Sequence, residues 1–416
     1  MQVYLVGGAV RDEQLGLPVT ERDWCVVGAT PDELSKLGYK RVGKDFPVFL
    51  HPETGEEYAL ARTERKTAAG YHGFEFDTSA DVTIEEDLGR RDLTINALAK
   101  DSDGQLIDPF DGLADINRRL IRHVSAAFAE DPVRILRAAK FAARFRRLGF
   151  RIAPETRDLM RQMVIDGEAD ALVPDRVWKE TEAALAGPDP RTFFEALRAS
   201  NALRAVLPEV DALFGVPQPA KWHPEIDTGL HTMMVLEQAS HLSTDVEVRF
   251  AAIAHDLGKA TTNSIDLPSH PGHELRGRRL IEALGKRLPI PRTCRDLAII
   301  TAEFHTHCHR AFELRPDTLV KLFDRTDALR RPERFEQFLL ACEADARGRT
   351  GYEDHHYPQA DYLRRALEVA ASIDAAGIAK ASDADAIGDS IRRARIAAVQ
   401  RWQSASGKDV QDHPGQ

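Results

Sequence analysis

The N-terminal stretch of the chain places a Gly-Gly pair between a short apolar run and two closely spaced carboxylates. The apolar run covers residues 3–6, the glycines are Gly7 and Gly8, and the carboxylates are Glu21 and Asp23. Alternate side chains of a strand point to the same face, so an extended segment here would turn both carboxylates to one side of a sheet. The stretch therefore predicts two strands around a glycine turn, with two carboxylates able to share one metal ion.

This acidic pair has the chemistry of a magnesium site. Mg²⁺ prefers oxygen ligands and usually completes its shell with substrate phosphates. Gly8 would let backbone N–H groups approach a phosphate at the start of a following helix, with Arg11 one turn further on. Each feature also has an ordinary explanation, because a Gly-Gly pair is usually a plain turn and Glu-x-Asp is usually a solvated face. Their occurrence together favours a site for Mg²⁺ and a nucleoside triphosphate.

Length and composition limit the possible classes of protein. A chain of 416 residues is too long for one ordinary core, and roughly two to four domains are expected. Its 43% hydrophobic and 29% charged residues include no apolar run near the ~18 residues of a membrane span, and no signal peptide is evident. Four cysteines without a Cys-x-x-Cys pair predict reduced thiols and a cytoplasmic location. The net charge of −10 argues against indiscriminate binding of nucleic acid.

Local patterns divide the chain into a mixed region and a helical one, which predicts an α+β fold with a small mixed sheet. Strand-like runs give way to amphipathic helical patterns from Pro132 onward, and nine of the fifteen histidines lie between His223 and His309. A polar tail at the C-terminus is expected to be disordered. The expected strands cover residues 3–6, 23–28, 46–50, 57–62 and 105–108. The predicted domains cover residues 1–125, 126–220, 221–347 and 348–416.

A basic helix is predicted after an acidic start at Asp131. This residue is expected to cap the helix, with Pro132 at its first position. One explanation is that Asp131 only caps and that the basic residues only face solvent. The alternative is that Asp131 accepts a proton from the amine of cytosine or adenine while Arg134 donates to the adjacent acceptor, which would reject uracil and guanine. The basic residues on one face of this helix are Arg134, Arg137, Lys140 and Arg144.

Six segments of the chain occur in the order and spacing of one known family. They are LVGGAVRD (5–12), ERDW (21–24), EEYALARTERK (56–66), RRDLTINALA (90–99), DPFDG (108–112) and EDPVRILR (130–137). Each segment is weak or moderate evidence alone, whereas six in order are strong evidence. The chain thus resembles the bacterial class II tRNA nucleotidyltransferases, the CCA-adding enzymes, in their longer form with an appended HD domain.

The resemblance implies an architecture and an activity. The activity is Mg²⁺-dependent addition of C, C and A to tRNA 3′ ends from CTP and ATP, without a nucleic-acid template, by a monomer or homodimer that needs no membrane. The fold would begin with a polymerase-β-like nucleotidyltransferase head. The implied domains are a head at 1–125, a helical neck and body at 126–220, an HD domain at 221–347 and a helical tail at 348–416.

The resemblance also implies roles for single residues. Glu21 and Asp23 would hold Mg²⁺, although many relatives have Asp at the first position, and Glu57 could add a third carboxylate. Lysine at position 140 departs from the usual arginine, which keeps the charge but loses the planar fork. The residues that would contact the nucleotide phosphates or the nucleotide are Gly8, Arg11 and Arg91. The residues that would read or support the base are Asp131, Arg134, Arg137 and Lys140.

The histidine-rich region resembles the HD phosphohydrolase family through the pattern His…His-Asp…Asp. The adjacent His255 and Asp256 end an apolar helix, while His231 and Asp345 would join them from other helices. A single histidine on an apolar face is usually a core residue, but four residues in this pattern predict a metal site. Imidazole and carboxylate ligands suit Ni²⁺, Mn²⁺, Co²⁺ or Mg²⁺ better than structural zinc.

Further residues could extend this site. His273 and His305 could hold a second metal ion or position a substrate phosphate, and Lys259 is placed to meet a phosphate. The resemblance implies 2′,3′-cyclic phosphodiesterase, 2′-nucleotidase and phosphatase activities, which would repair RNA ends before CCA addition. The alternatives are a poly(A) polymerase on the same head, a non-catalytic tRNA-binding protein, and an HD domain that is only a structural remnant.

Overall fold

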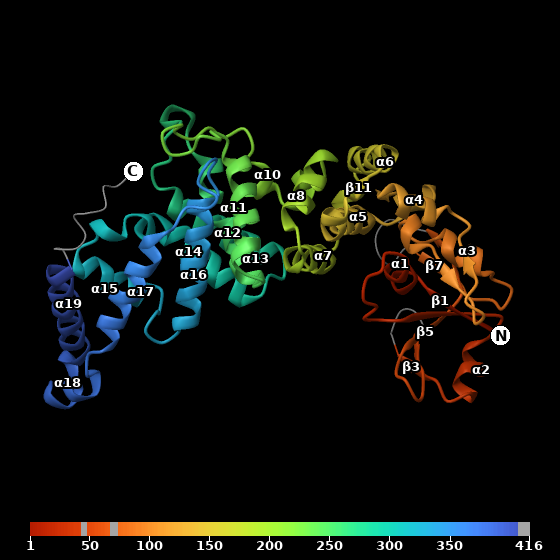
Figure 1. The fold of residues 1–416 in the computed structure, drawn as a ribbon, viewed down its shortest axis with the longest axis horizontal. Helices are drawn as coiled ribbons and strands as arrows, with labels where there is room; N and C mark the ends of the chain where they lie inside the picture. Colours follow the sequence, from red (N-terminus) through yellow and green to blue (C-terminus); the bar gives the residue numbers. More distant parts are fainter. Residues whose placement is uncertain (43–47, 67–73, 407–416) are drawn as a thin grey trace. The chain divides into compact units, whose positions relative to one another are not determined.

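The computed structural model describes residues 1–42, 48–66 and 74–406 of the chain. The chain forms two compact units, Met1–Pro208 and Glu209–Gln416. The first unit contains a small mixed sheet with helices, and the second is built from helices (Figure 1). The predicted α+β fold class is confirmed.

The sheet of the first unit brings the acidic segments together. The strands are β1 (Gln2–Val6), β2 (Asp23–Val27), β3 (Lys40–Val42), β4 (Val48–Leu50), β5 (Glu57–Leu60), β6 (Thr63–Lys66), β7 (Phe74–Asp77), β8 (Ala99–Lys100), β9 (Leu106–Ile107), β10 (Leu120–Ile121) and β11 (Arg151–Ile152). Seven of them form one sheet in the order β3-β4-β5-β2-β1-β8-β9, and β6-β7 and β10-β11 form two small sheets. The central strand β2 is antiparallel to β1 and parallel to β5. Each expected strand overlaps an observed one, although residues 46–47 lie outside the described residues.

The first unit contains nine described helices, of which α3 packs on one face of this sheet and α2 on the other. They are α1 (Gly8–Gln14), α2 (Pro31–Lys36), α3 (Ile84–Gly89), α4 (Gly112–Arg118), α5 (Val133–Phe145), α6 (Pro154–Ile165), α7 (Pro174–Ala186), α8 (Pro190–Ala199) and α9 (Ala202–Val206). Neighbouring residues of β2 face opposite ways, so Cys25 packs in one cluster with Leu88 of α3 and Val26 packs in another with Leu34 of α2. The sheet is therefore buried on both sides and holds the ends of its strands in fixed positions.

The basic helix expected after Asp131 is α5. Asp131 has an extended backbone, and its carboxylate accepts a hydrogen bond of 3.0 Å from the N–H of Val133. The helix begins at Val133 with Pro132 as its cap residue, one position later than expected, so Asp131 precedes the cap and its carboxylate binds the first N–H of the helix.

The second unit packs its helices closely around small side chains. Its helices are α11 (Thr228–Leu242), α12 (Val246–Ala254), α13 (His273–Arg287), α14 (Arg292–His309), α15 (Pro316–Arg325), α16 (Pro332–Arg347), α17 (Pro358–Ala371), α18 (Ala375–Ala381) and α19 (Ile387–Ser406), and the short α10 (Pro208–Asp211) lies at the junction of the units. Ala239, Ala252 and Ala344 pack together from α11, α12 and α16. Their small size lets the three helices approach, which places the end of α12 beside α16.

The C-terminal end of the chain is only partly described. Helix α19 ends at Ser406, and residues 407–416 of the tail expected to be disordered lie outside the described residues. Among the described helices, none has both the length and the apolar character needed to cross a membrane.

Candidate functional sites

Three carboxylates predicted for the N-terminal site lie near the start of β2. Asp23 is the first residue of β2, and the parallel register pairs it with Glu57 at the start of β5. Glu21 precedes the strand, so the expected extension of the whole Glu21–Trp24 segment is only partly observed. Desolvation raises the pKa of the Asp23 carboxyl and Glu21 raises it further, while Arg91 opposes the shift. The proximity of acidic groups at this edge suits a cation with oxygen ligands.

The glycine turn lies beside Arg91. Gly7 has a positive φ of 71° and precedes α1, and a Cβ atom at Gly7 would lie only 2.7 Å from Nη1 of Arg91. Glycine is required here both for the backbone conformation and for the close approach of the guanidinium. Arg91 is held from the other side by Asp87 at 3.2 Å. The turn, Arg91 and Asp23 are thereby brought to one region of the unit.

Arg11 occupies an enclosed position. Its side chain donates to Asp12 at 2.8 Å and also to Asn96, and its guanidinium lies 5.0 Å from the ring centres of Phe141 and Phe145. Only 2% of the residue is exposed. Arg11 therefore ties α1 to α5, and the phosphate contact expected for it stays a prediction.

The residues expected to read the base have separate partners in the structure. Both carboxylate oxygens of Asp131 accept hydrogen bonds from Arg176 of α7, at 3.1 and 2.8 Å. Arg134 donates to the backbone carbonyls of Ala127 and Arg90, at 2.9 and 2.6 Å. The sequence reasoning missed Arg176, because nothing local marks an arginine that lies 45 residues away on another helix.

The other basic residues of α5 each contact an acidic side chain. Arg137 pairs with Asp92 at 2.6 Å. Lys140 pairs with Glu180 at 2.6 Å, and Arg144 with Asp12 at 2.9 Å. These pairs attach α5 to three other segments, so part of the basic face is structural.

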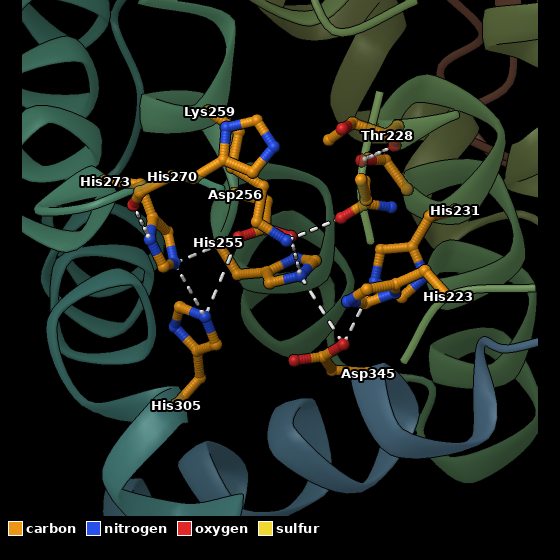
Figure 2. Close-up of polar contacts among 12 residues, drawn as sticks. His223, Thr228, His231, His255, Asp256, Lys259, His270, His273, His305 and Asp345 are labelled. Atoms are coloured by element: carbon orange, nitrogen blue, oxygen red, sulfur yellow. Dashed lines mark hydrogen bonds and ion pairs between the residues drawn. The ribbon is translucent and has the colours of Figure 1, made fainter. Parts of the chain in front are cut away.

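A second group of polar residues is buried in the C-terminal unit. His255 and Asp256 follow α12 directly, while His231 comes from α11 and Asp345 from α16 (Figure 2). Nε2 of His231 lies 3.0 Å from Oδ1 of Asp345, and Nε2 of His255 lies 3.7 Å from the same oxygen. His255 and Asp256 are 3.1 Å apart. The four residues expected from the sequence therefore form one cluster.

His273 and His305 form a second group with Asp256. Oδ1 of Asp256 lies 3.5 Å from Nε2 of His273 and 3.7 Å from Nε2 of His305. The two imidazole nitrogens are 3.3 Å apart (Figure 2). The other carboxylate oxygen of Asp256 lies 2.6 Å from Nζ of Lys259. Three sets of three ligand atoms thus have a spacing that can hold a metal ion. One lies around His255, one around Asp256, and the third consists of His223, Glu225 and His231.

The electrostatics of this cluster fit a cation. Within the described part of the chain, Nε2 of His255 and Oδ1 of Asp256 are buried without a hydrogen-bond partner. Burial lowers the pKa of His255, but Asp256 and Asp345 outweigh it and raise the pKa to about 9. Burial lowers the pKa of His305 to about 3, so this imidazole is neutral and can serve as a ligand. The mixture of nitrogen and oxygen donors matches divalent transition metals.

The structure adds three residues to the cluster. His309 lies one turn after His305, and its Nε2 atom is 2.7 Å from Oδ2 of Asp345. Glu225 and His223 contact each other and lie beside His231. Both come from the loop before α11, where the sequence carries no helical periodicity that would point them at the cluster.

Known families match three segments of this architecture. Residues 3–122 match the Poly A polymerase head domain, 149–214 the probable RNA and SrmB-binding site of polymerase A, and 228–331 the HD domain. The acidic edge of the sheet lies in the first segment, and most of the histidine cluster lies in the third. The fold and its two sites thus define a polymerase-type head joined to an HD domain.

Curated relatives match almost the whole chain. The Multifunctional CCA protein of Thioalkalivibrio sulfidiphilus (strain HL-EbGR7) is 61% identical over 408 residues, which cover 98% of this chain and 100% of the relative. That of Alkalilimnicola ehrlichii (strain ATCC BAA-1101 / DSM 17681 / MLHE-1) is 60% identical over 400 residues, which cover 96% of this chain and 97% of the relative. The chain belongs to the multifunctional CCA protein family. The resemblance drawn from the six sequence segments is confirmed.

Solved structures share the fold. A Thermotoga maritima CCA-adding enzyme complexed with tRNA_CCA has a TM-score of 0.63 and 19% identity, covering 96% of this chain and 87% of that chain. A CCA-adding enzyme in complex with CTP has a TM-score of 0.63 and 16% identity, covering 99% and 92%. At these identities the likeness concerns the fold.

Proposed function

We propose that this chain adds C, C and A to the 3′ end of tRNA, using CTP and ATP and releasing pyrophosphate. The observation that carries the proposal is the acidic edge of the sheet, where Asp23 pairs in register with Glu57 and lies close to Glu21 and Arg91. The names of the relatives support the same activity. We also propose that the protein acts in the cytoplasm and that it is a monomer or a homodimer.

In this mechanism the head positions the nucleotide for in-line attack. Bound Mg²⁺ would lower the pKa of the attacking hydroxyl and neutralise charge on the departing pyrophosphate. Glu21 and Asp23 would hold the metal, with Glu57 as an additional carboxylate. The tRNA 3′-oxygen forms a bond to the α-phosphorus while the bond to pyrophosphate breaks, and the protein contributes placement and charge. The groups proposed to contact the nucleotide are those of Gly8, Arg11 and Arg91.

Base selection is assigned to Asp131 and Arg134 at the start of α5. A carboxylate offers about four acceptor positions, so Asp131 can accept an exocyclic amine while it remains bound to Arg176. Arg137 and Lys140 support this helix through Asp92 and Glu180. Cytosine and adenine present the amine that this arrangement requires, whereas uracil and guanine present a carbonyl there.

The head is tested by removing its carboxylates. A Glu21→Ala/Asp23→Ala variant should lose nucleotide incorporation while retaining most of its affinity for tRNA in a filter-binding assay. The matched control is Glu53→Ala, a change at an exposed position of the same unit, which should leave incorporation intact. Continued tRNA extension by the double variant would refute the assignment.

We further propose that the C-terminal unit is a metal-dependent phosphohydrolase acting on 2′,3′-cyclic and 2′-phosphates. The observation that supports it is the pair of buried ligand atoms, Nε2 of His255 and Oδ1 of Asp256, that have no hydrogen-bond partner among the described residues. The metal, such as Ni²⁺, would be held by His231, His255, Asp256 and Asp345. His273 and His305 would hold a second ion or a substrate phosphate, and Lys259 would face the phosphate. A 3′-end repair role before CCA addition follows from this substrate class.

Hydrolysis of 2′,3′-cAMP tests this second activity. The metal-stripped chain should be inactive and should regain activity when Ni²⁺ is supplied. His255→Ala should abolish the hydrolysis, whereas His356→Ala, at an exposed histidine of the same unit, should not. If His255→Ala left the hydrolysis unchanged, the assignment would be abandoned.

A further inference from the structure

The loop of residues 217–227 lies outside the matched family segments, between 149–214 and 228–331. Its two ends are joined by a hydrogen bond of 2.7 Å from the N–H of Gln218 to the carbonyl of Ile226. A further bond of 2.9 Å connects the N–H of Thr228 to the carbonyl of Val216. The loop is thus closed at its base and enters α11, the helix that carries His231.

The 217–227 loop is attached to the histidine cluster. Nε2 of His270 lies 3.0 Å from the carbonyl oxygen of Pro217. Nζ of Lys259 donates to Oε1 of Gln218 at 2.6 Å and lies equally close to Asp256. These contacts fix the loop beside the residues proposed to bind metal.

Glu225 is the acidic residue of this loop that contacts His231, and His223 of the same loop packs against the His231 ring. The Oε1 atom of Glu225 lies 3.0 Å from Nδ1 of His231 and 3.1 Å from Nδ1 of His223. Its side chain is 3% exposed, and its Oε2 atom is buried without a hydrogen-bond partner in the described part of the chain. Burying a carboxylate in this way costs free energy unless positive charge lies nearby.

The hydrogen-bond partners of His231 determine which of its two ring nitrogens is available to bind a metal ion. Nδ1 faces two acceptors, Glu225 and the carbonyl oxygen of Gly348, both at 3.0 Å, so Nδ1 carries a proton. Nε2 faces another acceptor, Oδ1 of Asp345, at 3.0 Å. Burial lowers the pKa of His231, but the hydrogen bonds to Asp345 and Glu225 outweigh it and raise the pKa, so without a metal ion Nε2 also carries a proton. A neutral imidazole has a proton on only one nitrogen, so a metal ion that displaces the Nε2 proton binds the lone pair of Nε2. A metal ion that is bound by both Nε2 of His231 and Oδ1 of Asp345 satisfies these two atoms together.

The local charge balance points to a divalent cation. Glu225, Asp256 and Asp345 contribute three negative charges, and Lys259 contributes one positive charge. Without a metal ion, the raised pKa values of His231 and His255 favour two protonated imidazoles, which balance the remaining two negative charges. When both histidines bind a metal as neutral ligands, the two negative charges remain. One divalent ion balances them, and removing the Glu225 charge disturbs this balance without removing a ligand.

We propose that Glu225 is a positioning residue that fixes His231 with Nδ1 protonated and Nε2 free to bind the metal ion of the C-terminal unit. The inference rests on the proposed metal site and adds to it a carboxylate that touches the histidine rather than the metal. Such carboxylates orient a histidine ligand and raise its basicity, and their loss commonly weakens metal binding about 10–100-fold.

The backbone beside Glu225 is held in a strained conformation. Ile226 has a φ of 60°, a region that a β-branched side chain rarely adopts. Its N–H donates to the carbonyl of His223 at 2.9 Å. On the other side, Asp227 accepts a hydrogen bond of 2.8 Å from Leu230 and caps α11. The backbone conformation of Ile226 therefore fixes the direction in which the chain runs from Glu225 into α11, the helix that carries His231.

The inference is tested by calorimetric titration of Ni²⁺ into the metal-stripped full-length chain. Glu225→Ala should weaken Ni²⁺ binding about 10–100-fold with unchanged stoichiometry. Glu225→Gln should lose less, because its amide oxygen still accepts from Nδ1 but carries no charge. Glu368→Gln, the same chemical change at an exposed position of α17, should bind like the parent chain.

The outcomes separate this inference from the proposed function. If the parent chain takes up no Ni²⁺, the metal site itself is wrong. If the parent binds and both Glu225 variants bind equally well, the positioning role is wrong. A loss of one bound ion per chain would instead make Glu225 a ligand and would also overturn the inference. If Glu225→Ala is unfolded at the temperature of the titration, the Ni²⁺ affinity of the isosteric Glu225→Gln tests the inference instead.

Discussion

Asp92 shows how single residues organise the region proposed to bind the nucleotide. Its carboxylate accepts from the N–H of Leu93 at 2.9 Å, from Asn96 at 3.2 Å and from Arg137 at 2.6 Å. The residue is 6% exposed. Asp92→Asn removes the charge of a buried pair, so we expect the first unit to lose about 2 kcal/mol in its free energy of unfolding. Denaturant unfolding measures this loss, and Asp103→Asn, at an exposed position, is the control.

The contribution of Asp92 should depend on pH. Burial raises the pKa of Asp92, but Arg137 and the hydrogen bonds outweigh it, so the pKa in the folded chain lies below its usual value. A carboxyl with a lowered folded pKa stabilises the fold above its unfolded pKa of about 4, and this stabilisation is lost as the pH falls through the folded value. The difference between the parent and Asp92→Asn should be constant near neutral pH and shrink below about pH 4. A difference that grew in acid would contradict this explanation.

Sequence patterns predicted the residues of the candidate sites better than they predicted the side chains that pair with those residues. His231, His255, Asp256 and Asp345 were expected together and lie together. Arg176 was not expected beside Asp131. It belongs to another helix, and the sequence around Asp131 contains no pattern that indicates which side chain of that helix will contact it. The pairing of charges across helices depends on tertiary packing, which spacing along the chain does not encode.

At the scale of elements, the turn after α12 depends on Gly258. A Cβ atom at Gly258 would collide with the backbone carbonyl of His273 and the backbone N–H of Gly277, at the start of α13. Gly258→Ala should therefore push the 3₁₀ helix Leu257–Thr261 away from α13, at a cost of about 1–3 kcal/mol. Ni²⁺ binding should weaken with it, because Asp256 and His273 lie on the two separated elements.

A matched substitution in the same unit provides the control for Gly258. Gly388 lies in α19, and a Cβ atom there would meet no atom of the described residues within 4 Å. Gly388→Ala should leave the melting temperature unchanged or raise it, since alanine favours a helix by about 1 kcal/mol. Thermal melting and Ni²⁺ titration of both variants give the comparison. Equal behaviour of the two variants would show that the packing of the turn does not matter.

The elements themselves were predictable where their pattern was long or strongly alternating. The runs around β1, β2 and β5 were expected, and the amphipathic helix after Asp131 is α5. Strands such as β8 and β10 have two residues each, too few to show a period of two. Their positions follow from pairing with distant strands, so the sequence alone could not indicate them.

At the scale of the whole molecule, the two compact units should carry separable activities. A His255→Ala/Asp256→Ala variant should lose 2′,3′-cAMP hydrolysis and keep nucleotide incorporation. The Glu21→Ala/Asp23→Ala variant should show the reverse, because the two variants change different compact units and their substituted residues share no hydrogen-bond partner among the described residues. Both reactions are measured on both full-length proteins. Loss of both activities in either variant would contradict separate sites.

The most direct test of the account is the extension of a tRNA that lacks its CCA end, with CTP, ATP, UTP and GTP supplied separately and CTP and ATP supplied together. We expect two additions with CTP alone, little with ATP alone, and completion to CCA with both. UTP and GTP should not be incorporated. Long tails of A from ATP alone would instead identify a poly(A) polymerase, and no extension under any condition would indicate a tRNA-binding protein without catalysis.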